Sequence, residues 1–302
     1  NTLVGGLSGD SITTGQHNSS LGYQSLGANT TGVQNTAIGS QSLNANTTAH
    51  NNTAVGMNAL LNNTTGASNV AVGSVALDAN TTASNNVAIG YASLGANTTA
   101  GDNTAIGYAS STSNTTGSYN TALGAYSLGD NTTGQYNVAI GRQTLKYNTT
   151  ASNNTAVGYH SLQVNTTGEL NTAVGANTLD ANTTGSRNTA LGEFALSANT
   201  TASFNTGLVS SSLGLNTTGA SNTAVGHNSL QRNTTGANNT AIGGSALDAN
   251  TTGGNSVAVG TAALTSATTA SDNVAVGVSS LQENTTGHSN VAISNNALLR
   301  NT

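Results

Sequence analysis

The side chains of this sequence that could ligate a metal or transfer a proton are five histidines and ten acidic residues. The histidines are His17, His50, His160, His227 and His288. A metal site needs two or more side chains that converge within a few ångströms, and no two histidines lie within 17 residues of each other. Proton transfer by paired carboxylates has the same requirement. Such sites form only if the fold brings distant residues together.

A repeat of 17 residues fills the chain and shows why these groups stay apart. Asn35, Asn52, Asn69, Asn86 and Asn103 each open a near-copy of N-T-A-V-G-x-x-S-L-x-x-N-T-T-G-x-x. We number the repeat from Asn1 as position 1 and call each repeat a coil. Seventeen full coils and a partial eighteenth form one continuous array over residues 1–302, which we expect to be a fragment of a longer chain.

No two histidines share a coil, and the aspartates of position 10 lie in coils that are far apart in the array, so stacking of the coils does not gather either set of residues. Four aspartates share position 10, at least four coils apart: Asp10, Asp78, Asp180 and Asp248. No P-loop, G-x-G-x-x-G or G-x-S-x-G motif follows a candidate strand. We therefore predict no catalytic, metal-binding or cofactor-binding residue, no cofactor, and no enzymatic activity.

The composition excludes further classes of protein. Charged residues make up 5% of the chain and the net charge is −5, so no basic surface for nucleic acid is expected. There is no cysteine for a disulfide scaffold. No apolar run approaches the roughly 20 residues of a membrane span.

The repeat itself predicts an all-β fold, a parallel β-solenoid or β-roll of 17-residue coils. Seventeen residues are too few for a pair of helices, and each coil must bury its apolar side against its neighbours. In N-T-A-V-G, positions 2 and 4 share one face and position 3 takes the other. Position 4 is always Val, Ile or Leu, and position 9 is Leu in sixteen of eighteen coils. We expect these two positions to form the core, and asparagine rows at positions 1 and 12 to hydrogen-bond between coils.

Positions 6, 7, 10, 11, 16 and 17 vary freely and hold every charged, aromatic and histidine residue, so we expect them at the surface. Two large aliphatic side chains per coil are few for the backbone that they must order. We therefore expect several chains to share a core as a homotrimer, with a single-chain solenoid as the alternative.

The strand motif resembles the N-S-V-A-I-G head repeats of trimeric autotransporter adhesins. Its nearest copies are 273–277 (N-V-A-V-G) and 86–90 (N-V-A-I-G). The longer N-T-A-V-G-x-x-x-L-x-x-N-T-T-G form is similar to repeats of phage tail-fibre-like proteins. The resemblance implies a left-handed, homotrimeric β-roll on a cell surface or virion, with host-surface glycans or proteins as partners. The repeat is longer here than in adhesin heads, and the chain contains no stalk coiled coil and no membrane anchor.

The N-T-T element of the repeat is also an acceptor sequence for N-glycosylation. It is complete fifteen times, at Asn29, Asn46, Asn63, Asn80, Asn97, Asn114, Asn131, Asn148, Asn165, Asn182, Asn199, Asn216, Asn233, Asn250 and Asn284. A glycan on every coil would crowd its neighbours at a spacing of about 4.8 Å. The competing interpretation is an asparagine ladder in a turn, and sugars on the adjacent threonines are a further alternative.

Two features of the surface suggest contacts. Tyr91 and Tyr108 share position 6 in successive coils, and Tyr119 and Tyr136 share position 17; each pair forms a patch for sugars or proteins, or else packs only between coils. The threonine pairs at positions 13 and 14 suggest an ice-binding row, of which an extended chain would expose one residue per pair.

The sequence therefore predicts a structural shaft of an extracellular fibre, on a cell surface or a virion, that mediates or supports attachment. The alternative is a self-assembling extracellular filament, glycosylated on the N-T-T rows. An ice-binding solenoid is the third hypothesis.

Overall fold

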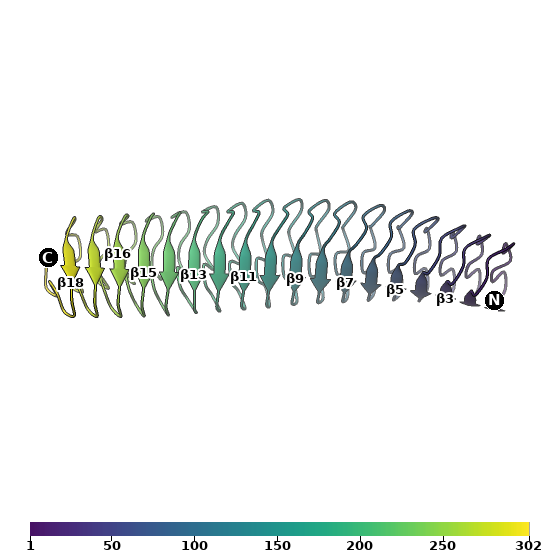
Figure 1. Cartoon of the computed structure of the whole chain (residues 1–302), viewed down its shortest axis with the longest axis horizontal. Coiled ribbons are helices and arrows are strands. Elements are labelled where there is room, and N and C mark those ends of the chain that lie inside the picture. The colour runs from purple at the N-terminus through teal and green to yellow at the C-terminus, as the bar shows by residue number, and fades with distance from the viewer. Residues whose placement is uncertain (302) are drawn as a thin grey trace. The chain divides into compact units, whose positions relative to one another are not determined.

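The computed structural model describes residues 1–301 and shows an all-β parallel solenoid with one short strand in every coil (Figure 1). By its internal contacts the chain divides into two units, Asn1–Ser152 and Asn153–Thr302. The described residues contain no helix, and hence none that is long and apolar enough to cross a membrane. The predicted solenoid and its period are confirmed.

Each strand has three residues and covers positions 2 to 4 of its coil. In the first unit the strands are β1 (Thr2–Val4), β2 (Ser19–Leu21), β3 (Thr36–Ile38), β4 (Thr53–Val55), β5 (Val70–Val72), β6 (Val87–Ile89), β7 (Thr104–Ile106), β8 (Thr121–Leu123) and β9 (Val138–Ile140). In the second unit they are β10 (Thr155–Val157), β11 (Thr172–Val174), β12 (Thr189–Leu191), β13 (Thr206–Leu208), β14 (Thr223–Val225), β15 (Thr240–Ile242), β16 (Val257–Val259), β17 (Val274–Val276) and β18 (Val291–Ile293). Within each unit, successive strands pair in parallel with a shift of one repeat, so like positions lie side by side.

The alternation within each strand places position 3 inside the coil and positions 2 and 4 outside. In β6, Ala88 is fully buried while Ile89 is 37% exposed. The expectation that position 4 belongs to the core of the coil is therefore wrong. A period of two separates the faces of a strand but does not say which face is inside. The narrow interior accepts the alanine methyl group and leaves the larger aliphatic side chain at the surface.

Fifteen of the eighteen coils hold one large apolar side chain in their interior, the leucine of position 9. The position-9 leucines from Leu26 to Leu281 have no exposed surface, whereas Leu298 in the partial last coil is 50% exposed. Ala88 and Ser93, which lie in the same coil as Leu94, are also fully buried. Leu94 adopts a φ of 52°, a left-handed conformation that costs a non-glycine residue roughly 1–2 kcal/mol. Burial of the side chain offsets this strain. The leucine therefore fills the interior of the coil and also forms part of a turn of its backbone.

The glycine of position 5 allows neighbouring coils to approach closely just after the strand. Gly22 has a φ of 144°, and a Cβ atom there would lie 2.5 Å from the Gly39 carbonyl oxygen. Val209 breaks this rule and adopts a φ of 84°. The next hydrogen bond in the row, from the Gly226 N–H to the Leu208 carbonyl, lengthens to 3.1 Å, compared with 2.8 Å from Gly243 to Val225. The coil is therefore locally altered at Val209.

Within each unit, the backbone of an inner coil is hydrogen-bonded to both neighbouring coils. The Leu94 N–H donates to the Ser110 carbonyl of the following coil at 3.0 Å, and the Ala92 N–H donates to the Ser74 carbonyl of the preceding coil at 3.1 Å. Thus even the turn residues between strands take part in the stack. The hydrogen bonds between coils are therefore not restricted to the strands but continue through the turns.

We predict that Leu94→Asp destabilises the stack, because it replaces the one large core side chain of a coil with a buried, unpaired carboxylate. The free energy of unfolding should fall by at least about 3 kcal/mol. Asp102→Ser in the same coil is the control, because Asp102 is exposed at position 17, and it should change the stability little. Equal thermal unfolding curves for the two variants would contradict this assignment of inside and outside.

Candidate functional surfaces

The asparagines of position 12 form a buried amide ladder. The Asn97 Nδ2 atom donates to the Asn80 Oδ1 atom at 3.2 Å, and the Asn114 Nδ2 atom donates in turn to the Asn97 Oδ1 atom at 3.1 Å. Asn97 Nδ2 also donates to the Ala100 carbonyl of its own turn at 3.0 Å. Both amide protons of Asn97 therefore have acceptors. The row is continuous from Asn29 to Asn148 in the first unit, whereas Ala267 interrupts it in the second.

The asparagines of position 1 form a second buried row that meets the first at position 15. The Asn86 side chain donates from Nδ2 to the Ala100 carbonyl at 3.0 Å, so this carbonyl accepts from two asparagines. The Asn86 backbone N–H donates to the Asn69 Oδ1 atom at 3.0 Å. The expected hydrogen bonds from coil to coil are present in both asparagine rows, and the asparagine side chains also bind backbone groups.

All fifteen asparagines of the N-T-T acceptor sequences lie in this row, although Asn284 is separated from the amide ladder by Ala267 and bonds only to the Gly287 carbonyl of its own turn. Every one of them, from Asn29 to Asn284, is fully or almost fully buried. An N-linked glycan replaces one proton of Nδ2 and must reach solvent, yet in the ladder Nδ2 is enclosed and donates to two oxygens. In the folded coil the atom that would carry the glycan is enclosed, and this observation favours the ladder interpretation.

Outside the coil, positions 2 and 4 of the strands form a regular surface, which we call the β-face. On β6, Val87 is half-buried and Ile89 is exposed, and they lie in register with Thr104 and Ile106 of β7. Position 4 supplies an aliphatic side chain in every coil, and position 2 supplies Thr or Val in all but one. An apolar row therefore runs along each unit at the surface.

The threonines of positions 13 and 14 form an edge on another part of the coil. The position-14 threonine is exposed in all seventeen coils that contain it. The position-13 threonine is half-buried in most coils, and its hydroxyl donates to the backbone of the next coil, as from Thr30 Oγ1 to the Thr47 carbonyl at 3.1 Å. The segment is a bend rather than an extended strand, so both residues of each pair reach the surface.

The predicted tyrosine pairs stack between coils and remain exposed. The ring centroids of Tyr91 and Tyr108 lie 5.3 Å apart, and those of Tyr119 and Tyr136 lie 5.0 Å apart. Each of these four rings keeps about half of its surface in contact with solvent. Packing between coils and a surface available for contact therefore coexist. The sequence also allowed Tyr126 to be added, since it lies one coil beyond Tyr108 at the adjacent position 7.

In the part of the chain that the structure describes, the histidines and acidic residues do not gather into a shared metal site. Among residues 1–301, no group of three or more His, Asp, Glu or Cys residues could hold a metal ion. The aspartates of position 10 stay in separate coils, and burial raises the pKa of the Asp78, Asp180 and Asp248 carboxyl groups above 3.8. These shifts reflect local desolvation and not a shared site.

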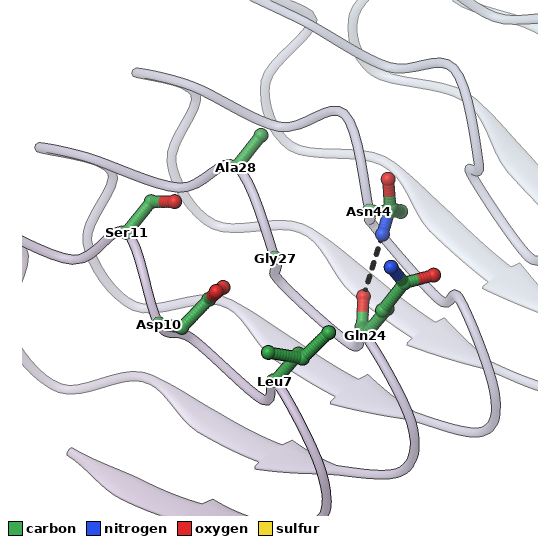
Figure 2. A pocket seen from close by; sticks show the side chains of 7 residues that line it. All are labelled: Leu7, Asp10, Ser11, Gln24, Gly27, Ala28 and Asn44. Carbon is green, nitrogen blue, oxygen red and sulfur yellow. Dashed lines mark hydrogen bonds between the residues drawn. The ribbon is translucent and has the colours of Figure 1, made fainter.

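A shallow hollow of about 230 Å³ lies on coils 1 to 3 (Figure 2). It forms where Gly27 takes position 10 between Asp10 and Asn44 and supplies no side chain. The Asn44 Nδ2 atom closes one side by donating to the Gln24 carbonyl at 2.8 Å. The hollow thus results from one missing side chain in a row and carries no convergent set of polar groups.

We predict that Asn97→Asp strongly destabilises the solenoid at neutral pH. The carboxylate would turn an oxygen towards Asn80 Oδ1 and the Ala100 carbonyl, which are both acceptors, in a buried site. The loss should be about 2–4 kcal/mol in chemical denaturation. Asn51→Asp, at exposed position 17, is the matched control; a similar loss for both variants would show that the ladder is not the cause.

Replacing Asp180 with Asn should raise the stability at neutral pH. Burial raises the pKa of this carboxyl group, and its Oδ1 atom has no hydrogen-bond partner among the described residues. A raised pKa means that the folded state favours the protonated form, so stability is lost as the pH rises through the raised value. The gain of Asp180→Asn should be on the order of 0.5 kcal/mol at pH 7, because the group is only half-buried. It should vanish below pH 3.8; a gain that persists there would exclude this cause.

Comparisons with known proteins do not assign the chain to a family. The chain matches no protein-family model and no curated protein. The function must therefore be inferred from the β-face, the threonine edge and the exposed tyrosines themselves.

Proposed function

We propose that this chain is the structural shaft of an extracellular fibre, in which copies of the chain associate through the β-face as a homotrimer. The single observation that carries the proposal is the row of Val, Ile and Leu side chains at position 4. It is present in every coil, yet it lies outside the coil, where folding of the single chain leaves these side chains exposed or only half-buried.

The size of the β-face supports association. Nine strands spaced by about 4.8 Å give each unit a stripe roughly 43 Å long and on the order of 400 Å² in area. The stripes of the two units of one chain add up to about 800 Å², which is the area that each partner typically contributes to a specific interface. The stripe contains no charged residue, which fits the depletion of charge at interface centres.

The interior of the coil buries few large apolar side chains, and this also supports association. A coil buries at most one leucine, while its other buried side chains are alanine, serine or threonine, and asparagine. A second apolar layer, made by position 4 of several chains, would add the burial that a single coil lacks. The ladder of every coil and the absence of convergent chemistry among the described residues favour a scaffold that supports attachment over an enzyme.

Association can be tested with charges placed on the β-face. The variant Ile38→Lys, Val72→Lys, Ile106→Lys changes alternate coils, so the new charges are about 9.6 Å apart within a chain. The wild-type chain should sediment at three times 29.6 kDa, and the variant should sediment as a folded monomer. An open-ended series of masses for the wild-type chain would favour the self-assembling filament, and a wild-type monomer would exclude association.

The matched control for this experiment is Thr48→Lys, Thr82→Lys, Thr116→Lys. It places the same charges in the same three coils but on the threonine edge, where position 14 is exposed. It should keep the wild-type mass. Dissociation of this control would show that charge anywhere on the coil is sufficient, and would remove the support for the β-face.

One observation favours ice binding as a second candidate function. The threonine edge exposes a hydroxyl and a methyl group at position 14 of every complete coil, at a regular spacing set by the strands. The threonine control variant tests this hypothesis as well. If the edge binds ice, the wild-type chain should inhibit ice recrystallisation and this variant should not, whereas the β-face variant should retain the effect.

A further inference from the structure

The aromatic residues are concentrated in one part of the chain. Seven of the eight tyrosines lie between residues 91 and 159. In the first unit, four of them join the only lysine of the protein in one continuous surface, which we call the aromatic strip: Tyr91, Tyr108, Tyr126, Lys146 and Tyr147. They occupy the variable positions 6, 7, 10 and 11 of coils 6 to 9, so the repeat itself does not require them.

The members of the strip hold one another in place. Tyr108 stacks on Tyr91 and meets Tyr126 edge-on, both at 5.3 Å between ring centroids. The Lys146 Nζ atom lies 5.8 Å from the Tyr126 ring centre and 4.5 Å from that of Tyr147, and it donates to the Tyr147 hydroxyl at 3.1 Å. A partner would therefore meet side chains that are already ordered, which lowers the entropic cost of binding.

The strip is accessible and keeps its hydrogen-bonding groups. Tyr91 and Tyr108 are each 51% exposed, Tyr147 is 40% exposed and Tyr126 is 36% exposed. Tyr126, together with Tyr91, raises the pKa of the Tyr108 phenol, so this phenol keeps its proton at neutral pH. The strip offers ring edges and phenolic hydroxyl groups side by side.

The charge of the strip distinguishes it from the rest of the unit. Residues 1–152 contain four aspartates and two cations, and both cations, Arg142 and Lys146, lie in coil 9. Arg142 is exposed at position 6, in the same row as Tyr91 and Tyr108. Coils 8 and 9 contain one acidic residue, Asp130. It is a neighbour of Lys146, because its backbone N–H donates to the Lys146 carbonyl at 2.9 Å. The coil 9 end of the strip, where both cations lie, would therefore attract an anion.

We propose that the aromatic strip binds an acidic polysaccharide, a chain of sugar rings that carries carboxylate or sulfate groups. Tyrosine rings combine an apolar body with a polar hydroxyl group, which matches the C–H faces and hydroxyl groups of a sugar. Lys146 would pair with the acidic group in a charge-assisted contact. The step of 5.3 Å between neighbouring rings is close to the length of one sugar residue, so successive sugars can meet successive tyrosines.

The shape of the surface favours a polymer over a small molecule. Small ligands are usually enclosed by a concave pocket, and the hollow of Figure 2 lies in coils 1 to 3, away from coils 6 to 9. An extended chain can instead lie along several coils and make a series of weak contacts. The proposal does not depend on association through the β-face, and in an oligomer the strips of several chains would act together by avidity.

Binding should be measured by biolayer interferometry with immobilised alginate oligosaccharides, which carry carboxylates, and dextran sulfate, which carries sulfates. Neutral dextran and poly-L-glutamate serve as comparison probes. The full chain should bind one or both acidic polysaccharides, and the one that binds identifies the acidic group. Tyr126→Ala and Lys146→Gln should each weaken this binding by about tenfold or more, and Asp130→Asn should strengthen it at low salt.

The stacked pair on another row provides the matched control. The double variant Tyr119→Ala, Tyr136→Ala removes two equally exposed rings from coils 7 and 8, and it should bind like the wild-type chain. All variants change exposed or half-exposed side chains, and their thermal unfolding should confirm the fold. The proposal is overturned by any of four results: no binding of either acidic polysaccharide; equal binding of neutral dextran or poly-L-glutamate; no loss in the strip variants; or an equal loss in the control.

Discussion

The convergence of two asparagine rows on one backbone carbonyl is the interaction on which the rest of this solenoid depends. In each coil the turn at position 15 directs its carbonyl group inward, where an unsatisfied acceptor would be costly. Asn86 and Asn97 both donate to the Ala100 carbonyl, and their own oxygen atoms accept from the next coil. The polar groups of one coil are thus completed by the following coil, so the period must stay at 17 residues.

This polar interior has a consequence for the exterior. With two asparagines, an alanine and a serine inside, each coil has space for one leucine. The second large aliphatic side chain, at position 4, lies on the β-face together with Thr or Val at position 2. A surface row of this kind gains little from the folding of one chain, but it provides a uniform surface along which further copies can pack. The inference of a fibre shaft follows from this division of apolar residues between the two sides of a strand.

The coils differ from one another mainly at the variable positions, while the positions that form the ladder recur. Because the ladder involves positions 1, 12 and 15, side chains at positions 6, 7, 10 and 11 can change without affecting it. The aromatic strip uses this freedom: Tyr108, Tyr126 and Lys146 occupy different positions in different coils, yet they come into contact because the coils are stacked. A scaffold of this type can acquire a binding surface at any point along its length by substitution alone.

The sequence by itself determined the coil, its period, the strand at positions 2 to 4 and the asparagine rows, because each follows from a residue type that recurs in every repeat. The stacking of Tyr91 on Tyr108 was also predictable, since like positions in successive coils must be neighbours. Only the tertiary structure decided which face of the strand is inside, because alternation is symmetric between the faces and the width of the closed coil selects Ala88 over Ile89. It also decided that Leu94 adopts a left-handed conformation, against the local preference of leucine, since only the closed coil provides the burial that offsets the strain. The burial of the N-T-T asparagines also depends on the tertiary structure: an acceptor sequence is a local pattern, whereas the enclosure of its amide group depends on the neighbouring coils.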